Sequence, residues 1–117
     1  MRPPSPRVAA SAARLRAIKA DIEAHLALGD VSAASVARRQ NVSDSYIRKL
    51  FEGEQTSFSE FVLGRRLLRV HRLLMDPRRV NQSIASLAFE VGFGDLSYFN
   101  RAFKRSYGAT PSEIRGH

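Results

Sequence analysis

The sequence contains two divergent copies of one short helical unit, in residues 32–52 and 83–104. An internal repeat of one supersecondary unit restricts the chain to folds that are built from two copies of that unit. The second copy has a central turn that is longer by one residue. Matching positions therefore lie 51 residues apart before the turn and 52 apart after it: Ala37 and Ala88, Asn41 and Gly92, then Ile47 and Phe99, Phe51 and Phe103.

The second copy has the pattern of two helices separated by a glycine turn. A short apolar run from Ile84 to Val91 ends at Gly92, and glycine readily takes the positive φ that ends a helix. Asp95 is a suitable N-cap for a second helix. The apolar side chains of that helix recur at three- and four-residue spacing: Phe99, Ala102, Phe103 and Tyr107. A short helix, a tight turn and an amphipathic helix together predict a helix-turn-helix.

The outer face of the second helix is polar or basic in both copies. In the first copy, Asn41 takes the turn position and Ser43 caps the helix. The outward stripes at matched spacing are Asp44, Ser45, Arg48, Lys49 and Glu52 in the first copy, and Leu96, Ser97, Asn100, Arg101 and Lys104 in the second. Most of these side chains can hydrogen-bond base edges or phosphates. The alternative interpretation is that these stripes are ordinary solvent-exposed faces without a binding role. The spacing that the two copies share argues against it.

A long helix is expected between the two copies, from a capping box at Ser57 and Glu60 to the helix-ending pair Asp76 and Pro77. At 1.5 Å per residue it forms a rod of about 28 Å. Such a rod can hold two recognition helices about one DNA turn apart, near the ~34 Å that separates successive major grooves on one face of a duplex.

Four segments follow from these patterns. A helix from about Ser11 to Leu28 is expected to open the first copy, and Thr110 with Glu113 forms a capping box for a last short helix. The segment at the start of the chain contains three of the five prolines. The expected segments are a flexible tail or linker remnant at 1–10, a first helix-turn-helix subdomain at 11–56, a linker helix at 57–76 and a second helix-turn-helix subdomain at 77–117.

The charge balance indicates a nucleic acid as the partner. Nineteen Lys and Arg against eleven Asp and Glu give a net charge of +8 and a pI near 11.0, as in many small domains that bind polyanions. The chain has no cysteine, three scattered histidines and no apolar run long enough to span a membrane. It has no glycine-rich phosphate loop and no pairing of nucleophile with base. We therefore expect a cytoplasmic protein that is not an enzyme, with no cofactor and no metal.

The pattern from about Leu15 to Arg115 resembles the DNA-binding domain of the AraC/XylS family of bacterial transcription regulators. The most specific matching positions are Arg66-Leu67, Val70, Leu73 and Leu74 in the linker helix, then Ile84-Ala85, Ala88, Gly92-Phe93, Ser97, Phe99, Arg101, Phe103-Lys104, Gly108 and Thr110-Pro111. The resemblance implies an all-α fold of about seven helices, in which a long helix joins two helix-turn-helix subdomains. The sequence departs from the family pattern at two positions. Gln55 stands where glycine is common, and Leu96 stands where a polar residue is common.

The resemblance also implies roles for individual residues. Base contacts are expected from the two outward stripes. Arg66 and Lys104 belong to basic faces of the chain, and for that reason we expect them to contact phosphate. The positions that match the family's base-reading residues are Ser45, Arg48 and Lys49 in the first copy and Leu96, Ser97, Asn100 and Arg101 in the second. Leu96 is apolar, so it is suited to a thymine methyl rather than a hydrogen bond. The implied partners are an operator in double-stranded DNA and RNA polymerase, with an effector or dimerisation domain outside this chain.

Two alternatives remain open from the sequence. The outward stripes suit a basic helical protein-interaction module that contacts RNA polymerase or another acidic partner. Titration with unrelated duplex DNA separates this from DNA binding, because DNA affinity falls steeply as salt rises. The four phenylalanines Phe51, Phe93, Phe99 and Phe103 are of the type that stacks on single-stranded bases, but their spacing is that of core positions.

Overall fold

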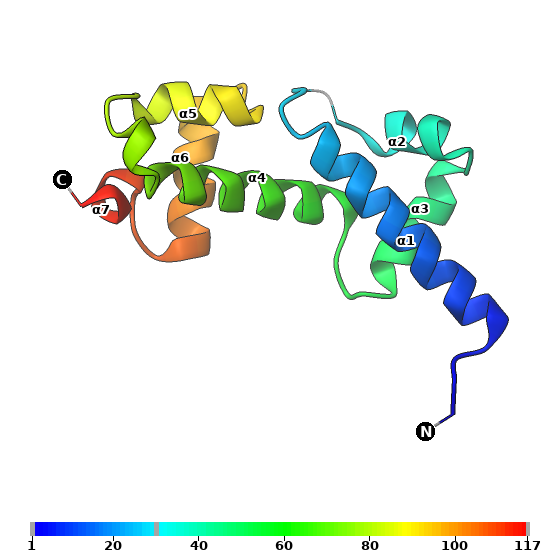
Figure 1. Ribbon diagram of the computed structural model, residues 1–117. Coiled ribbons are helices and arrows are strands. Elements are labelled where there is room, and N and C mark those ends of the chain that lie inside the picture. Colours follow the sequence, from blue (N-terminus) through cyan, green and yellow to red (C-terminus); the bar gives the residue numbers. More distant parts are fainter. Residues whose placement is uncertain (1, 30, 117) are drawn as a thin grey trace. The chain divides into compact units, whose positions relative to one another are not determined.

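The computed structural model describes residues 2–29 and 31–116, and Figure 1 shows that this part of the chain is helical. None of its helices is long and apolar enough to cross a bilayer. The described residues form seven α-helices and one 3-10 helix and contain no strand, which confirms the expected all-α class and helix number. The elements are α1 (Pro6–Ala24), α2 (Ala33–Gln40), α3 (Asp44–Glu52), α4 (Phe58–Leu74), η1 (Pro77–Arg79), α5 (Ile84–Val91), α6 (Leu96–Tyr107) and α7 (Pro111–Arg115).

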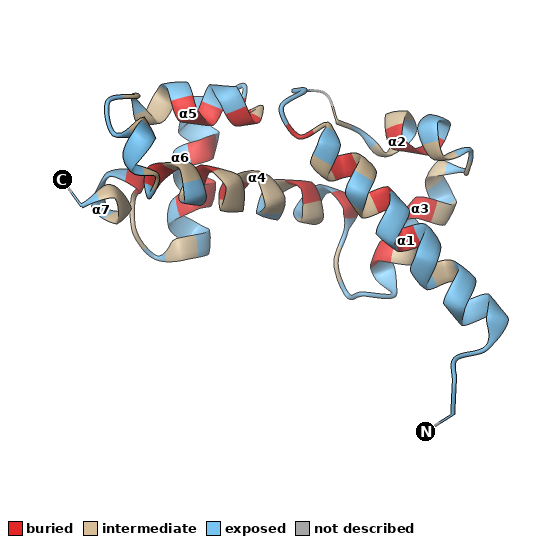
Figure 2. Ribbon diagram, viewed as in Figure 1, coloured by how far each residue is buried: buried red, intermediate tan, exposed pale blue. Residues whose placement is uncertain are grey.

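The helices divide into two compact units, and buried residues occur in both (Figure 2). The first unit contains α1, α2, α3 and the start of α4. The second contains the rest of α4, all later elements and the short segment Leu26–Gly29. Buried side chains of the first unit include Leu15, Ile18, Ile22, Val36, Ile47, Phe51, Phe58 and Val62. The core of the second is Leu67, Val70, Leu74, Leu87, Ala88, Val91, Phe93, Phe99, Ala102 and Phe103.

The repeat seen in the sequence extends to the helix that precedes each helix-turn-helix. The buried apolar residues of α1 and α4 correspond at a spacing of 52: Leu15 and Leu67, Ile18 and Val70, Ile22 and Leu74. Each copy of the repeat therefore has three helices, α1 to α3 in the first copy and α4 to α6 in the second. In each copy the first helix supplies apolar side chains that help to bury the inner face of the two helices after it.

Local capping determines where most helices begin. The side chains of Ser32, Ser43, Ser83, Asp95 and Thr110 each accept a hydrogen bond from a backbone N–H in the first turn of the next helix. The expected box at the last helix is complete, because the Glu113 side chain also accepts from the Thr110 N–H. The expected left-handed turn positions are confirmed as well, at φ 57° for Asn41 and φ 112° for Gly92. Gln55, which replaces the glycine common in the family, is also left-handed, at φ 59°.

Three expected helix boundaries were wrong. The first helix begins at Pro6 rather than near Ser11, because Ser5 accepts a hydrogen bond from the Val8 N–H and proline is favoured at the first helical position. It ends at Ala24, before Leu28. The linker helix ends at Leu74, and Asp76 instead caps η1 by accepting from the Arg78 N–H.

The four phenylalanines considered for base stacking are core residues. Phe51, Phe99 and Phe103 are completely buried, and Phe93 is nearly so. Phe99 packs against the rings of both Phe93 and Phe103, with ring centroids 4.9 and 5.7 Å apart. The faces of these rings are therefore closed to an incoming base, and stacking on single strands is not their role.

Candidate nucleic-acid interface

The helix α3 presents its polar residues outward because its apolar residues are fixed inside the first unit. Ser43 Oγ accepts from the Tyr46 N–H at 3.1 Å, which sets the start of the helix. Ile47 and Phe51, one turn apart, are both completely buried. The three residues expected to contact bases, Ser45, Arg48 and Lys49, are accordingly all exposed.

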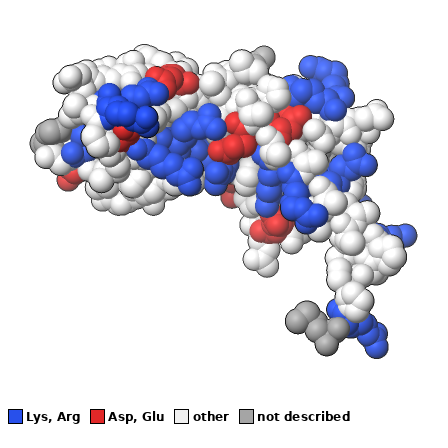
Figure 3. All heavy atoms as spheres, in the orientation of Figure 1, with Lys and Arg blue, Asp and Glu red and all other residues white. Residues whose placement is uncertain are grey.

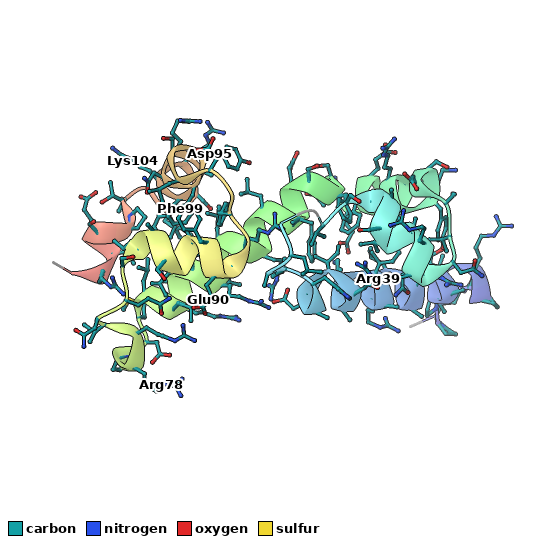
Figure 4. The ribbon with its side chains drawn as sticks, turned by 90° about the horizontal axis from the view of Figure 1, so that it is seen from above. Arg39, Arg78, Glu90, Asp95, Phe99 and Lys104 are labelled. Carbon is teal, nitrogen blue, oxygen red and sulfur yellow. The ribbon has the colours of Figure 1, made fainter. Side chains whose placement is uncertain are left out.

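The helix α6 is arranged in the same way in the second unit. Asp95 Oδ1 accepts from the Tyr98 N–H at 3.0 Å and fixes its first turn. Figure 4 shows Phe99 directed from α6 toward α5 and α4, while Lys104 extends away from them. The expected DNA contacts of this helix are all exposed: Leu96, Ser97, Asn100, Arg101 and Lys104. Leu96 is 36% exposed.

A groove runs beside α3 in the first unit. It has a volume of about 440 Å³ and is lined by Arg48 and Glu52 of α3, the start of α2 at Ser32 and the start of α4 at Ser57. One cation, one carboxylate and hydroxyl groups thus share a surface next to the expected base-reading residues. A groove of this kind offers both hydrogen-bond donors and hydrogen-bond acceptors to a polar ligand.

The second unit has a groove at the corresponding place. It has a volume of about 500 Å³ and lies between Asn100 of α6, the start of α5 at Ile84 and Ala85, and the start of α7 at Thr110. Leu96 also lines it, but no charged side chain does. A groove therefore lies at the same place beside α3 and beside α6. The groove beside α3 is lined by charged side chains and the groove beside α6 by neutral ones.

The turn between α5 and α6 needs glycine for two reasons. Gly92 has φ 112°, which side-chain-bearing residues rarely adopt. A Cβ atom at this position would also overlap the carbonyl oxygen of Leu26 and crowd the guanidinium of Arg66. The close approach of Leu26 to the turn positions the entry to α6.

Arg66 makes hydrogen bonds inside the second unit. Its Nε donates to the Leu26 carbonyl at 3.1 Å and its Nη2 to the Leu28 carbonyl at 2.7 Å. Burial disfavours the charged guanidinium and lowers the pKa of Arg66 below its usual value. The expected phosphate contact of Arg66 stays a prediction. The structure gives this side chain an additional role as a support for the glycine turn.

A matching arginine in the first unit was missed from the sequence. Arg14 lies 52 residues before Arg66, and its Nη1 donates to the Gln40 carbonyl at 3.3 Å, next to the left-handed Asn41. Each helix-turn-helix thus has an arginine from the preceding helix near its turn. The signal that could have found Arg14 is the repeat spacing, once it is extended to α1.

Not every basic side chain is available to a ligand. Figure 3 shows Lys and Arg over both units with acidic side chains among them. In the first unit, Arg39 of α2 pairs with Asp21 at 2.6 Å, and Gln40 also donates to that carboxylate. Burial opposes the ionisation of Asp21, but the hydrogen bonds from Arg39 and Gln40 outweigh it and hold the pKa of the carboxyl below its ordinary value.

Comparison with known proteins gives one matching family and several relatives. A family model described as a helix-turn-helix domain matches residues 36–117. The transcriptional activator RhrA of Rhizobium meliloti is 42% identical over 102 residues, which are 87% of this chain and 32% of that protein. The transcriptional activator PerA of Escherichia coli is 30% identical over 87% of this chain and 34% of its own length. This chain spans about a third of the length of these relatives.

Two solved structures have a similar fold. The C-terminal domain of AraT, a response regulator from Geobacillus stearothermophilus, is 28% identical with a TM-score of 0.77, over 87% of this chain and 83% of that one. A DNA-binding transcriptional dual regulator from Escherichia coli K-12 is 26% identical with a TM-score of 0.77, over 87% and 94% of the two chains. The similarity covers both copies of the repeat.

Proposed function

Because this chain belongs to the AraC/XylS type of helix-turn-helix domain, we propose that it binds an operator in double-stranded DNA through α3 and α6 and thereby regulates transcription. The observation that carries this proposal is that α3 and α6 each have one apolar face and one polar or basic face. In each, aromatic and aliphatic side chains are buried while a stripe of polar or basic side chains is exposed. A helix with these two faces can enter the major groove of DNA without unfolding its unit.

The proposal assigns the two stripes to base contacts in two successive major grooves. Arg48 and Arg101 are suited to paired hydrogen bonds with guanine, and Asn100 to paired bonds with adenine. Leu96 is suited to a thymine methyl. The remaining base-contacting positions are Ser45, Lys49 and Ser97, while Lys104 and Arg66 contact phosphate.

RNA polymerase is the second proposed partner, since the relatives RhrA and PerA are transcriptional activators. An activator bound at an operator acts by contact with the transcription machinery. The competing interpretation, in which the same stripes bind only an acidic protein, has no support from these relatives. The stripes cannot contact DNA and polymerase at once, so polymerase contact would use another surface.

Fluorescence anisotropy with labelled duplexes tests the proposal. Binding to an unrelated duplex should weaken steeply as salt rises, because each neutralised phosphate releases counterions. Selection from a random duplex library should then yield a preferred sequence with two separate conserved blocks. Failure to bind duplex DNA at low salt, together with binding to an acidic protein, would support the competing interpretation.

A further inference from the structure

Two tyrosines occupy the same position in the repeat and have no role in the function proposed above. Tyr46 is the third residue of α3 and Tyr98 the third residue of α6, 52 positions later. Both have their backbone N–H held by the capping side chain, at 3.1 Å from Ser43 Oγ and at 3.0 Å from Asp95 Oδ1. The two side chains therefore leave the same point of the two recognition helices.

That point is on the flank of each helix. Successive residues of an α-helix are about 100° apart, so Tyr98 lies between the outward Ser97 and the buried Phe99. Its side chain is 46% exposed, and that of Tyr46 is half-buried. When a helix enters a major groove, its outward stripe meets base edges and its flanks face the sugar-phosphate backbones.

A positively charged side chain interacts with Tyr98. The guanidinium of Arg66 lies near enough for an electrostatic interaction with the tyrosine, and hydrogen bonds to Leu26 and Leu28 hold it in place. No described residue hydrogen-bonds to the hydroxyl of Tyr98 or of Tyr46. A phenol O–H beside a fixed cation can donate to a phosphate oxygen.

We propose that Tyr46 and Tyr98 each donate a hydrogen bond to a DNA backbone phosphate, one in each half of the operator. This inference rests on the proposed function. A neutral donor neutralises no phosphate, so it strengthens binding without releasing a counterion. The tyrosines should therefore set the affinity of each half of the site without changing the dependence on salt.

The test uses Tyr46→Phe and Tyr98→Phe, which remove the hydroxyl and keep the ring. Each should weaken binding about three- to tenfold, the usual effect of one hydrogen bond, for selected and unrelated duplexes alike. The slope of log affinity against log salt should equal that of the parent. Tyr107→Phe is the matched control on α6, because its half-buried ring packs against the core, with ring centroids 4.7 Å from Phe103 and 4.8 Å from His71. It should bind DNA like the parent.

The outcomes separate this inference from the function on which it rests. If the parent binds DNA and both variants bind equally well, the tyrosines have no part in binding and the inference is overturned. A loss confined to the selected sequence would make the tyrosines base contacts and would also overturn it. If the parent itself does not bind duplex DNA, the proposed function fails first.

Discussion

Arg66 Nη2 donates a hydrogen bond to the carbonyl oxygen of Leu28 at 2.7 Å. Through Nε the same guanidinium reaches the Leu26 carbonyl, so one planar group satisfies two backbone acceptors of the segment Leu26–Gly29. The Leu26 carbonyl in turn lies against Gly92, where the chain turns into α6. This arginine and the glycine therefore act together on the position of the second recognition helix.

Replacing Arg66 should destabilise the second unit. Arg66→Ala leaves the buried residue Leu26 without the donor to its carbonyl, while water can replace the donor at the exposed Leu28. The variant should lower the free energy of unfolding by about 1 to 3 kcal/mol. Arg66→Lys should recover only part of this, because an ammonium group lacks the planar fork. Urea unfolding measures the free energy of unfolding of both variants.

Lys104→Ala is the comparison for Arg66, since Lys104 is exposed. It should unfold like the parent, weaken binding to all duplexes and reduce the salt slope by about one. If Arg66→Ala has this second pattern and unfolds like the parent, then Arg66 acts on phosphate alone, and its contacts with Leu26 and Leu28 contribute no stability.

Gly92→Ala should cost more stability than Gly108→Ala. Both glycines have positive φ, at 112° and 74°, which costs a residue with a Cβ about 1 to 2 kcal/mol. Only at Gly92 does the added Cβ meet a backbone atom, the Leu26 carbonyl oxygen, whereas Gly108 has open space around it. Thermal unfolding of the two variants should rank them clearly. Equal losses would show that backbone conformation alone requires glycine at residue 92.

Phe103→Ala should remove about 3 to 5 kcal/mol of stability, the usual cost of truncating a buried aromatic residue. Phe103 is completely buried and packs on Phe99 and Tyr107. Phe89→Ala is the control, because Phe89 is 52% exposed on α5, and its effect should stay within about 0.5 kcal/mol. Urea midpoints compare the two variants. Similar losses in both would mean that α5 and α6 do not bury the faces seen in the structure.

The features that the sequence predicted correctly depend on neighbouring residues. Ser43, Asp95 and Thr110 cap helices through backbone groups three residues away, so their effect is visible in a short window. The start of α1 was missed because the capping Ser5 stands among prolines that suggested a tail. The contacts of Arg66 with Leu26 and Leu28 join residues far apart in the chain, and no local pattern encodes them.

Stability should depend on pH through Asp21. Its pKa is lower in the folded protein, so its contribution is complete above the ordinary value near 3.9 and is lost as pH falls through the folded value. Asp21→Asn should cost about 1 to 3 kcal/mol at pH 7, since the bonds from Arg39 and Gln40 weaken.

This cost should shrink as the pH falls below about 4, because the parent carboxyl then becomes neutral too. Glu52→Gln, at an exposed position, should stay within about 0.5 kcal/mol of the parent at neutral pH. Urea unfolding at several pH values gives the difference. A cost for Asp21→Asn that is constant with pH would mean that the carboxylate charge is not what binds Arg39.

Arg48 and Arg101 should each determine part of the preferred DNA sequence. Both are exposed on recognition helices, and arginine can make two hydrogen bonds with guanine O6 and N7, worth about 1 to 3 kcal/mol of discrimination. Arg48→Ala should relax the preference at one or two base pairs in one half of the operator, and Arg101→Ala in the other half. The two helices belong to separate units, so the double variant should show nearly additive losses. Selection from a random duplex library with each variant measures this. If both variants lose preference at the same base pairs, or if neither changes the selected sequence, the two helices do not read separate halves of the site.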